Sequence, residues 1–255
     1  NKYMEKILIL IDELYKLFNY IPIDVEFAFT QEKNSQILWL LQTRRLILKR
    51  KTETIKEQHN RLKILEKKIK EKQKPHPFLM GKKTVFGVMP DWNPAEIIGV
   101  RPQPLALSLY RELVTDSIWA YQRNNYGYRN LRSFPLLLSF SGLPYIDVRV
   151  SFNSFIPSDL STDIADKLVN FYIKRLQSNE KMHDKIEFDI VFSCFTFDLP
   201  KRIKLLGKEN FSLSEQNEII KKLKHLTNKI MSPKNGLWRK DIKKISELSK
   251  RQEII

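Results

Sequence analysis

Four polar residues near the start of the chain have the types and spacing that a metal and phosphate site needs. Asp24 and Glu26 lie two residues apart, and so do Gln42 and Arg44. Side chains two apart point to the same face of a strand, so a hairpin would bring the four together. Carboxylate and amide oxygens suit Mg²⁺, and the guanidinium fork suits phosphate. The alternative to a binding site is a half-exposed hairpin whose solvent-exposed face carries ordinary polar residues.

A hairpin and a preceding helix must position these side chains. The segment 21–44 reads as two strands joined by a polar turn. Residues 2–18 carry apolar side chains at helical spacing, and Pro22 ends that pattern and opens the first strand. We therefore expect a helix packed behind the hairpin.

The motif Asp24-Val25-Glu26-Phe27, followed after a polar turn by Leu40-Leu41-Gln42-Thr43-Arg44, carries a resemblance. It resembles the end of the nucleotide-binding domain of the phosphoenolpyruvate synthase and pyruvate phosphate dikinase family. That ATP-grasp domain closes with a hairpin reading roughly D-I-E-F … L-Q-x-R-P. The chain departs from the pattern at Arg45, where the family usually has Pro.

The resemblance implies roles for three of the four residues. Glu26 and Gln42 would contact the magnesium–ATP complex and act as metal ligands, and Arg44 would contact phosphate as the catalytic residue. Asp24 joins them as a fourth candidate for cofactor binding. The implied activity is that of an ATP-dependent phosphotransferase (a kinase-type transferase), with ATP and an unidentified phosphoryl acceptor as its partners. Since the rest of the ATP-grasp domain is absent, the chain would be a fragment, inactive without the remaining domains of its parent.

Asn93-Pro94-Ala95-Glu96-Ile97, followed by Pro104-Leu105, carries a second and looser resemblance. It is similar to the segment that follows the ATP-grasp domain in the rifampin phosphotransferase branch of the same superfamily. There, an Asn-x-x-Glu stretch and a Pro-Leu precede a helix. In this chain Leu105, Leu109 and Leu113 repeat every four residues, which predicts an amphipathic helix.

Charge suggests a different class of function. The 255 residues contain 45 Lys and Arg against 29 Asp and Glu, a net charge of +16. Residues 49–74 hold eleven basic and four acidic side chains, and their apolar residues form a narrow seam that predicts a solvated helix. A basic, helix-rich module that binds nucleic acid or an acidic partner therefore remains the alternative, although residues 49–74 include no aromatic side chain to stack on bases.

The predicted fold class is α+β with three parts. Residues 1–48 would end the ATP-grasp domain, residues 49–83 would form a charged helical linker, and residues 84–255 would form a mostly helical module with a few antiparallel strands. Alternation of apolar and polar residues predicts strands over 144–153 and 186–194. Ser212 and Glu215 predict a capping box at the start of a helix reaching about Met231.

Other classes of site are disfavoured by composition. One cysteine, Cys194, allows no intrachain disulfide and no cysteine metal cluster. Seven glycines without a cluster provide no phosphate-cradling loop. His183 and Asp184 form a possible acid–base pair by type, although a surface histidine is the simpler interpretation. No apolar run is long enough for a membrane span, and we expect a cytoplasmic protein.

Overall fold

The computed structural model describes residues 2–32, 35–46, 54–179, 181, 183 and 189–252. Helices hold 56% of the residues and strands 14%, and the strands form two small antiparallel sheets. The α+β prediction is therefore confirmed. The chain divides into two compact units, Asn1–Arg61 and Leu62–Ile255, and the division falls within helix α2 (Ile55–Gln73). Each unit is described by itself.

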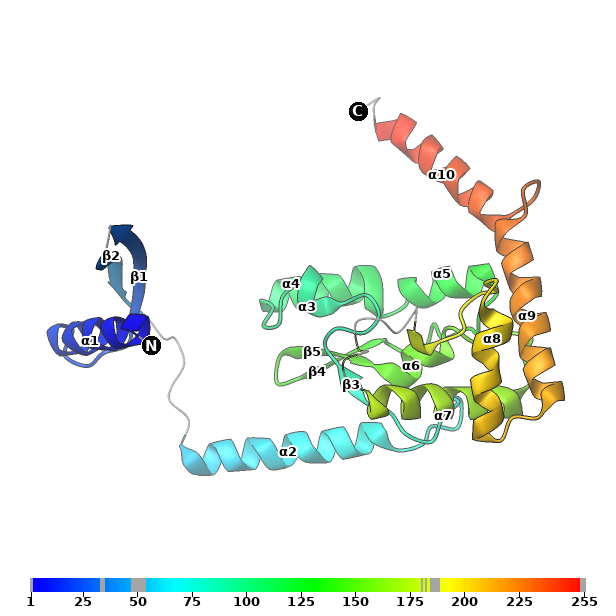
Figure 1. Cartoon of the computed structure of the whole chain (residues 1–255), viewed down its shortest axis with the longest axis horizontal. Helices are drawn as coiled ribbons and strands as arrows, with labels where there is room; N and C mark the ends of the chain where they lie inside the picture. Colours follow the sequence, from blue (N-terminus) through cyan, green and yellow to red (C-terminus); the bar gives the residue numbers. More distant parts are fainter. Residues whose placement is uncertain are drawn as a thin grey trace. The chain divides into compact units, whose positions relative to one another are not determined.

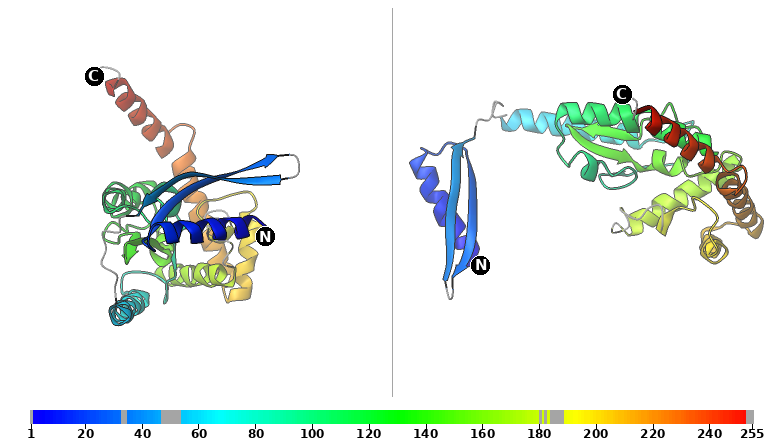
Figure 2. Two further views of the ribbon diagram at one scale, coloured as in Figure 1. Left: turned by 90° about the vertical axis from the view of Figure 1, so that its left-hand side faces the viewer. Right: turned by 90° about the horizontal axis from the view of Figure 1, so that it is seen from above.

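Unit 1 is a helix packed on a two-stranded ribbon, as the sequence predicts. Helix α1 (Lys2–Leu17) precedes strands β1 (Ile23–Glu32) and β2 (Ser35–Arg45), which pair antiparallel. Figure 2 shows α1 lying against one face of the ribbon. Tyr3 meets Phe29 edge to face with ring centroids 4.9 Å apart, which fixes the helix on the face that carries Phe29.

Unit 2 is helix-rich and surrounds a three-stranded antiparallel sheet of order β3-β5-β4 (Figure 1). Short helical segments separate β3 from β4 in the chain and follow β5, and longer helices complete the unit. In chain order its elements after α2 are β3 (Phe86–Gly87), α3 (Pro94–Ile97), α4 (Pro104–Tyr110), η1 (Arg111–Thr115), α5 (Ile118–Tyr126), β4 (Leu137–Phe140), β5 (Leu143–Asp147), α6 (Val148–Asn153), α7 (Thr162–Ser178), α8 (Leu199–Arg202), η4 (Ile203–Glu209), α9 (Leu213–Met231) and α10 (Leu237–Gln252).

Helix α6 is the centre of unit 2, and the strand predicted over 144–153 is confirmed only as far as Asp147. Strand β5 ends at Asp147, whose carboxylate accepts the backbone N–H of Val150 and caps the helix. All six residues of α6 are buried. Because every side of this helix is covered, its sequence carries no helical apolar stripe. The residues V-R-V-S-F-N instead alternate between apolar and polar, and this alternation led to the prediction of a strand.

The apolar and the polar residues that alternate along α6 make different kinds of contact. Val148 and Phe152 belong to the core cluster formed with α7, α8 and α9, and Val150 belongs to the cluster formed with α5 and the sheet. The polar side chains between them, Arg149, Ser151 and Asn153, bind other segments of unit 2 and are as buried as the apolar ones. The polar side chains of α6 thus form a buried set of contacts.

Two of the polar side chains of α6, those of Arg149 and Asn153, form hydrogen bonds to backbone groups of segments that precede the sheet. Arg149 donates to the carbonyl oxygens of Lys74 at 2.8 Å and Lys72 at 3.4 Å, at the C-terminal end of α2. Asn153 donates to the carbonyl oxygen of Met80 and accepts its N–H, both at 2.9 Å. Arg149 therefore links the end of α2 to α6, and Asn153 links the segment around Met80 to α6.

Other predicted elements are found with small shifts. The capping box of Ser212 and Glu215 opens α9 as predicted, and α2 ends two residues before Pro75. The expected helix from Leu105 is present as α4, η1 and α5 in succession. Of the strand predicted over 186–194, residues 186–188 lie outside the described part, and residues 189–194 do not form a strand. None of the helices in the described part of the chain is long and apolar enough to cross a membrane.

Candidate functional site

The hairpin brings the four predicted residues together. In the register of β1 and β2, Asp24 lies opposite Arg44 and Glu26 lies opposite Gln42. Because the two pairs are two positions apart, all four side chains project from the same face of the ribbon. The result is a small polar surface with two carboxylates, one amide and one guanidinium.

An ion pair orients the guanidinium. Nε and Nη2 of Arg44 donate to the same carboxylate oxygen of Asp24, at 2.8 and 2.7 Å. This hydrogen bond, and then the charge of Asp24, raise the pKa of Arg44. The contacts use two of the five N–H donors of a guanidinium, so the other three are left for a further anion.

The polar surface lies on the face of the ribbon that α1 does not cover. Phe29 contacts Tyr3 of α1, and Phe27 lines a cavity of about 230 Å³ between the ribbon and α1, which Asp24 also borders. Glu26, Gln42 and Arg44 are exposed, and Asp24 is half-buried. Glu26, Gln42 and Arg44 are therefore accessible to a ligand from the side opposite the helix.

A β-bulge makes this arrangement possible. The register shifts between Glu26 and Phe27, so that Gln42 pairs with Glu26 while Leu40 pairs with Phe27, and Leu41 is the extra residue. Without the bulge, Leu40 would share the polar face with Gln42. The extra residue allows Leu38 and Leu40 to share the α1 face with Phe29 and Phe27, while the polar pairs stay together.

The polar surface is incomplete as a metal site. In the described residues no group of three or more His, Cys, Asp or Glu side chains is placed to hold a metal ion. Glu26 and Gln42 offer two hard oxygen donors side by side. That set fits Mg²⁺ only where phosphate oxygens and water supply the remaining ligands, which is how Mg²⁺ is usually bound.

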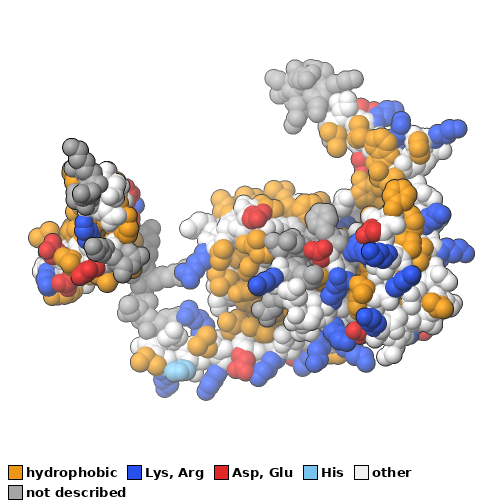
Figure 3. All heavy atoms as spheres, in the orientation of Figure 1, with side chains coloured by type: hydrophobic (Ala, Val, Ile, Leu, Met, Phe, Trp, Pro, Cys, Tyr) orange, Lys and Arg blue, Asp and Glu red, His pale blue; other side chains and the backbone are white. Residues whose placement is uncertain are grey.

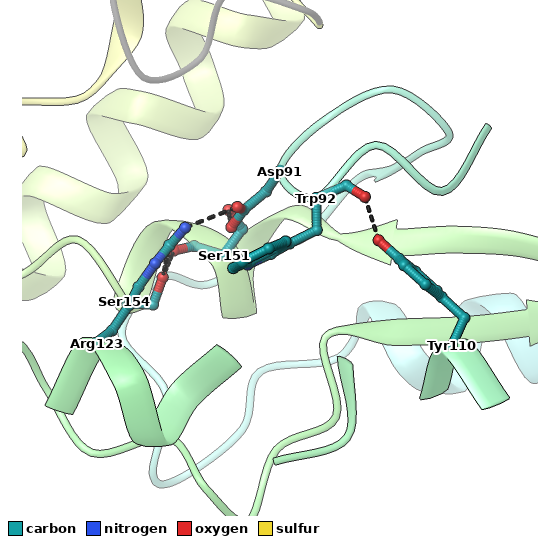
Figure 4. A network of polar contacts seen from close by, with 6 residues as sticks. All are labelled: Asp91, Trp92, Tyr110, Arg123, Ser151 and Ser154. Atoms are coloured by element: carbon teal, nitrogen blue, oxygen red, sulfur yellow. Dashed lines mark hydrogen bonds and ion pairs between the residues drawn. The ribbon is translucent and has the colours of Figure 1, made fainter. Parts of the chain in front are cut away.

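A second constellation, which the sequence did not reveal, lies in unit 2 (Figure 4). Asp91 accepts from Nη2 of Arg123 at 2.7 Å and, through its other oxygen, from the hydroxyl of Ser151 at 2.7 Å. Arg123 also donates to the hydroxyl of Ser154 and lies over the ring of Phe155, 4.0 Å from its centroid. Both carboxylate oxygens are engaged, so this network is a clamp rather than an acid–base site.

The clamp holds a strained turn. Asp91 and Trp92 both have positive φ angles, 40° and 57°, which cost free energy in residues other than glycine. The hydroxyl of Tyr110 donates to the carbonyl oxygen of Trp92, and burial raises the pKa of Tyr110 to about 12, which keeps this donor protonated. The turn is thus fixed from one side by Arg123 and Ser151 and from the other by Tyr110.

The turn also explains the Asn-x-x-Glu stretch. The side chain of Asn93 accepts the backbone N–H of Glu96 at 3.2 Å, which caps the short helix α3. The sequence signal for the clamp was weak, because Asp91, Arg123 and Ser151 come from three distant segments. Of the possible His183–Asp184 pair, Asp184 lies outside the described residues.

Comparisons with models of protein families, with curated proteins and with solved structures found no match to this chain.

Proposed function

We propose that the polar face of the β1–β2 hairpin is one wall of a magnesium–ATP site in an ATP-dependent phosphotransferase similar to phosphoenolpyruvate synthase. One observation carries the proposal: the register places Asp24 opposite Arg44 and Glu26 opposite Gln42 on the face that α1 leaves open. The likeness of the motif to the final hairpin of an ATP-grasp domain supports the same assignment. A cytoplasmic location belongs to this proposal.

The roles follow from the chemistry of the side chains. Glu26 and Gln42 provide oxygen donors for the Mg²⁺ that accompanies ATP. Arg44 donates its remaining N–H groups to phosphate oxygens and stabilises the negative charge that develops during phosphoryl transfer. Asp24 positions the guanidinium through the two hydrogen bonds that it already accepts.

The hairpin provides part of a site, so the proposal assigns the other walls to further segments of the parent protein. The phosphoryl acceptor is a further partner of the proposed enzyme. Under this proposal the isolated 255-residue chain binds magnesium–ATP weakly and transfers no phosphoryl group.

The test is a titration of the chain with magnesium–ATP in which the backbone amide chemical shifts are measured. We expect shifts at Glu26, Gln42 and Arg44, and a loss of about tenfold in affinity in Arg44→Ala, the size of one charge-assisted hydrogen bond. Arg45→Ala is the matched control, because Arg45 is the adjacent exposed arginine and its side chain projects from the opposite face. Unchanged shifts at these residues, or equal affinities of the two variants, would contradict the proposal.

A second candidate function is the binding of nucleic acid by helix α2. Helix α2 has no buried residue and carries seven basic against three acidic side chains. As the alternative proposal, α2 binds the phosphate backbone of nucleic acid. Binding to DNA or RNA that weakens steeply with added salt would support it, because neutralised phosphates release counterions.

A further inference from the structure

Helix α10 continues beyond its contact with the rest of unit 2. Near its start, the carboxylate of Asp241 accepts the hydroxyl of Tyr126, the last residue of α5. From Ile242 to Glu247 every side chain is exposed, and Figure 1 shows α10 leading away from the end of α9. This part of the helix is therefore open to a partner.

The exposed part of α10 carries an apolar row. Ile242 and Ile245 are 56% and 62% exposed, and Trp238 is half-buried at the start of the same row. Side chains three or four residues apart lie on one side of a helix, so the three form a continuous strip. The two isoleucines thus extend the strip from a partly covered tryptophan into solvent.

Basic side chains occupy much of the remaining surface of α10. The acidic side chains described on this helix are Asp241, which is bonded to Tyr126, and Glu247. Figure 3 shows hydrophobic and basic side chains next to one another on the helix. Four basic side chains are exposed, and they form two pairs whose members are four residues apart: Arg239 with Lys243, and Lys240 with Lys244.

The segment that leads into α10 adds to this charge. Lys229 near the end of α9 and Lys234 in the turn before α10 are both exposed. With them, residues 229–247 contain six basic and two acidic side chains, a net charge of 6 − 2 = +4. The surface is therefore complementary to an anionic partner, and charge alone would suit either nucleic acid or a membrane.

The apolar strip distinguishes between these two partners. Nucleic acid would neutralise the basic side chains but leave Ile242 and Ile245 in water. The surface of a bilayer uses both kinds of side chain, because apolar groups enter between the headgroups while long basic side chains extend to the phosphates. Trp238 is half-buried and lies beside the guanidinium of Arg239, 4.9 Å from it, so its ring is not free to stack on a base.

We propose that α10 is an amphipathic helix that lies in the surface of a bilayer containing anionic phospholipids. In this arrangement Ile242 and Ile245 point toward the acyl chains, and the four exposed basic side chains of α10 bind headgroup phosphates. The proposal does not depend on the magnesium–ATP site, which uses residues of unit 1.

Co-sedimentation of the whole chain with lipid vesicles tests the proposal. The vesicles contain phosphatidylcholine alone or an equal mixture of phosphatidylcholine and phosphatidylglycerol. We expect binding to the anionic vesicles that weakens with added salt, and at least about tenfold weaker binding to the neutral ones. Ile245→Asn should weaken binding to the anionic vesicles by about tenfold, because a polar side chain replaces an apolar one in the bilayer. Its matched control is Ile64→Asn, since Ile64 is 70% exposed on the basic helix α2.

Charge reversal separates α10 from the rest of this basic chain. The double variant Lys243→Glu and Lys244→Glu should lower the affinity for anionic vesicles by at least about tenfold. The double variant Lys63→Glu and Lys67→Glu in α2 changes the net charge equally and should lower the affinity less. Circular dichroism of each variant verifies that it folds.

Any of the following results would overturn the proposal: no binding to anionic vesicles, equal losses of affinity in the α10 and α2 charge variants, or vesicle binding that Ile245→Asn leaves unchanged. A helix that binds nucleic acid instead would give the last of these results. It would also bind RNA with the same affinity in Ile245→Asn as in the unchanged protein.

Discussion

Asp91 and Arg123 form a buried ion pair that joins the Trp92 turn to α5. Their side chains are 3% and 12% exposed, and the two groups are 2.7 Å apart. Ser151 and Ser154 of the α6 region complete the hydrogen bonds of the pair (Figure 4). Since neither oxygen of Asp91 is left without a partner, the contact is a structural tie.

Loss of one member of this pair should be costly. We expect Asp91→Ala to lower the free energy of unfolding by about 3–5 kcal/mol, because Arg123 would be left buried without its counter-charge. Urea denaturation followed by circular dichroism measures the change. Removal of Asp116, which forms an exposed pair with Arg111, is the control and should cost about 1 kcal/mol or less. Similar losses in the two variants would contradict the assignment of a buried tie.

Arg149 should stabilise the end of α2 in particular. In Arg149→Met the carbonyl groups of Lys72 and Lys74 lose their shared donor, at a cost of about 1–3 kcal/mol. Amide hydrogen exchange should accelerate in the last turn of α2. Lys68→Met is the control. The side chain of Lys68, which belongs to α2, also donates to a backbone carbonyl oxygen, that of Ser139, but this contact is exposed. Equal exchange in both variants would refute the capping role.

Asp147 should make the stability of unit 2 depend on pH. Burial raises the pKa of Asp147 above its ordinary value of 3.8, although hydrogen bonds from Thr84 and the backbone oppose this. A raised pKa in the fold means that the native state retains a proton that the unfolded state has released. Its contribution to stability is therefore complete below about pH 3.8 and decreases as the pH rises to the folded-state pKa.

The variant Asp147→Asn isolates this contribution. An amide keeps the acceptor for Thr84 and Val150 but carries no charge to bury. We expect the free energy of unfolding of Asp147→Asn, minus that of the unchanged protein, to increase with pH above about 3.8 and then level off. A flat difference for Asp147→Asn would contradict burial as the main cause of its pKa.

The sequence by itself determined the local elements of this protein. Helix α1, the hairpin and the capping box of Ser212 follow from periodicity, turn residues and side-chain caps, which act between residues close in the chain. That Asp24, Glu26, Gln42 and Arg44 come together also follows, because a hairpin joins neighbouring segments. The α+β class could be predicted for the same reason.

Only the tertiary structure decided the remaining features. The same alternation that predicts a strand in 148–153 forms a helix, because burial on all sides removes the need for an apolar stripe. The leucine stripe of α4 is exposed, and no local pattern tells a face that meets the core from one left for a partner. The Asp91–Arg123 clamp joins residues 32 positions apart, and the bulge at Leu41 depends on which face α1 covers. These features depend on contacts between distant segments, and local spacing contains no information about such contacts.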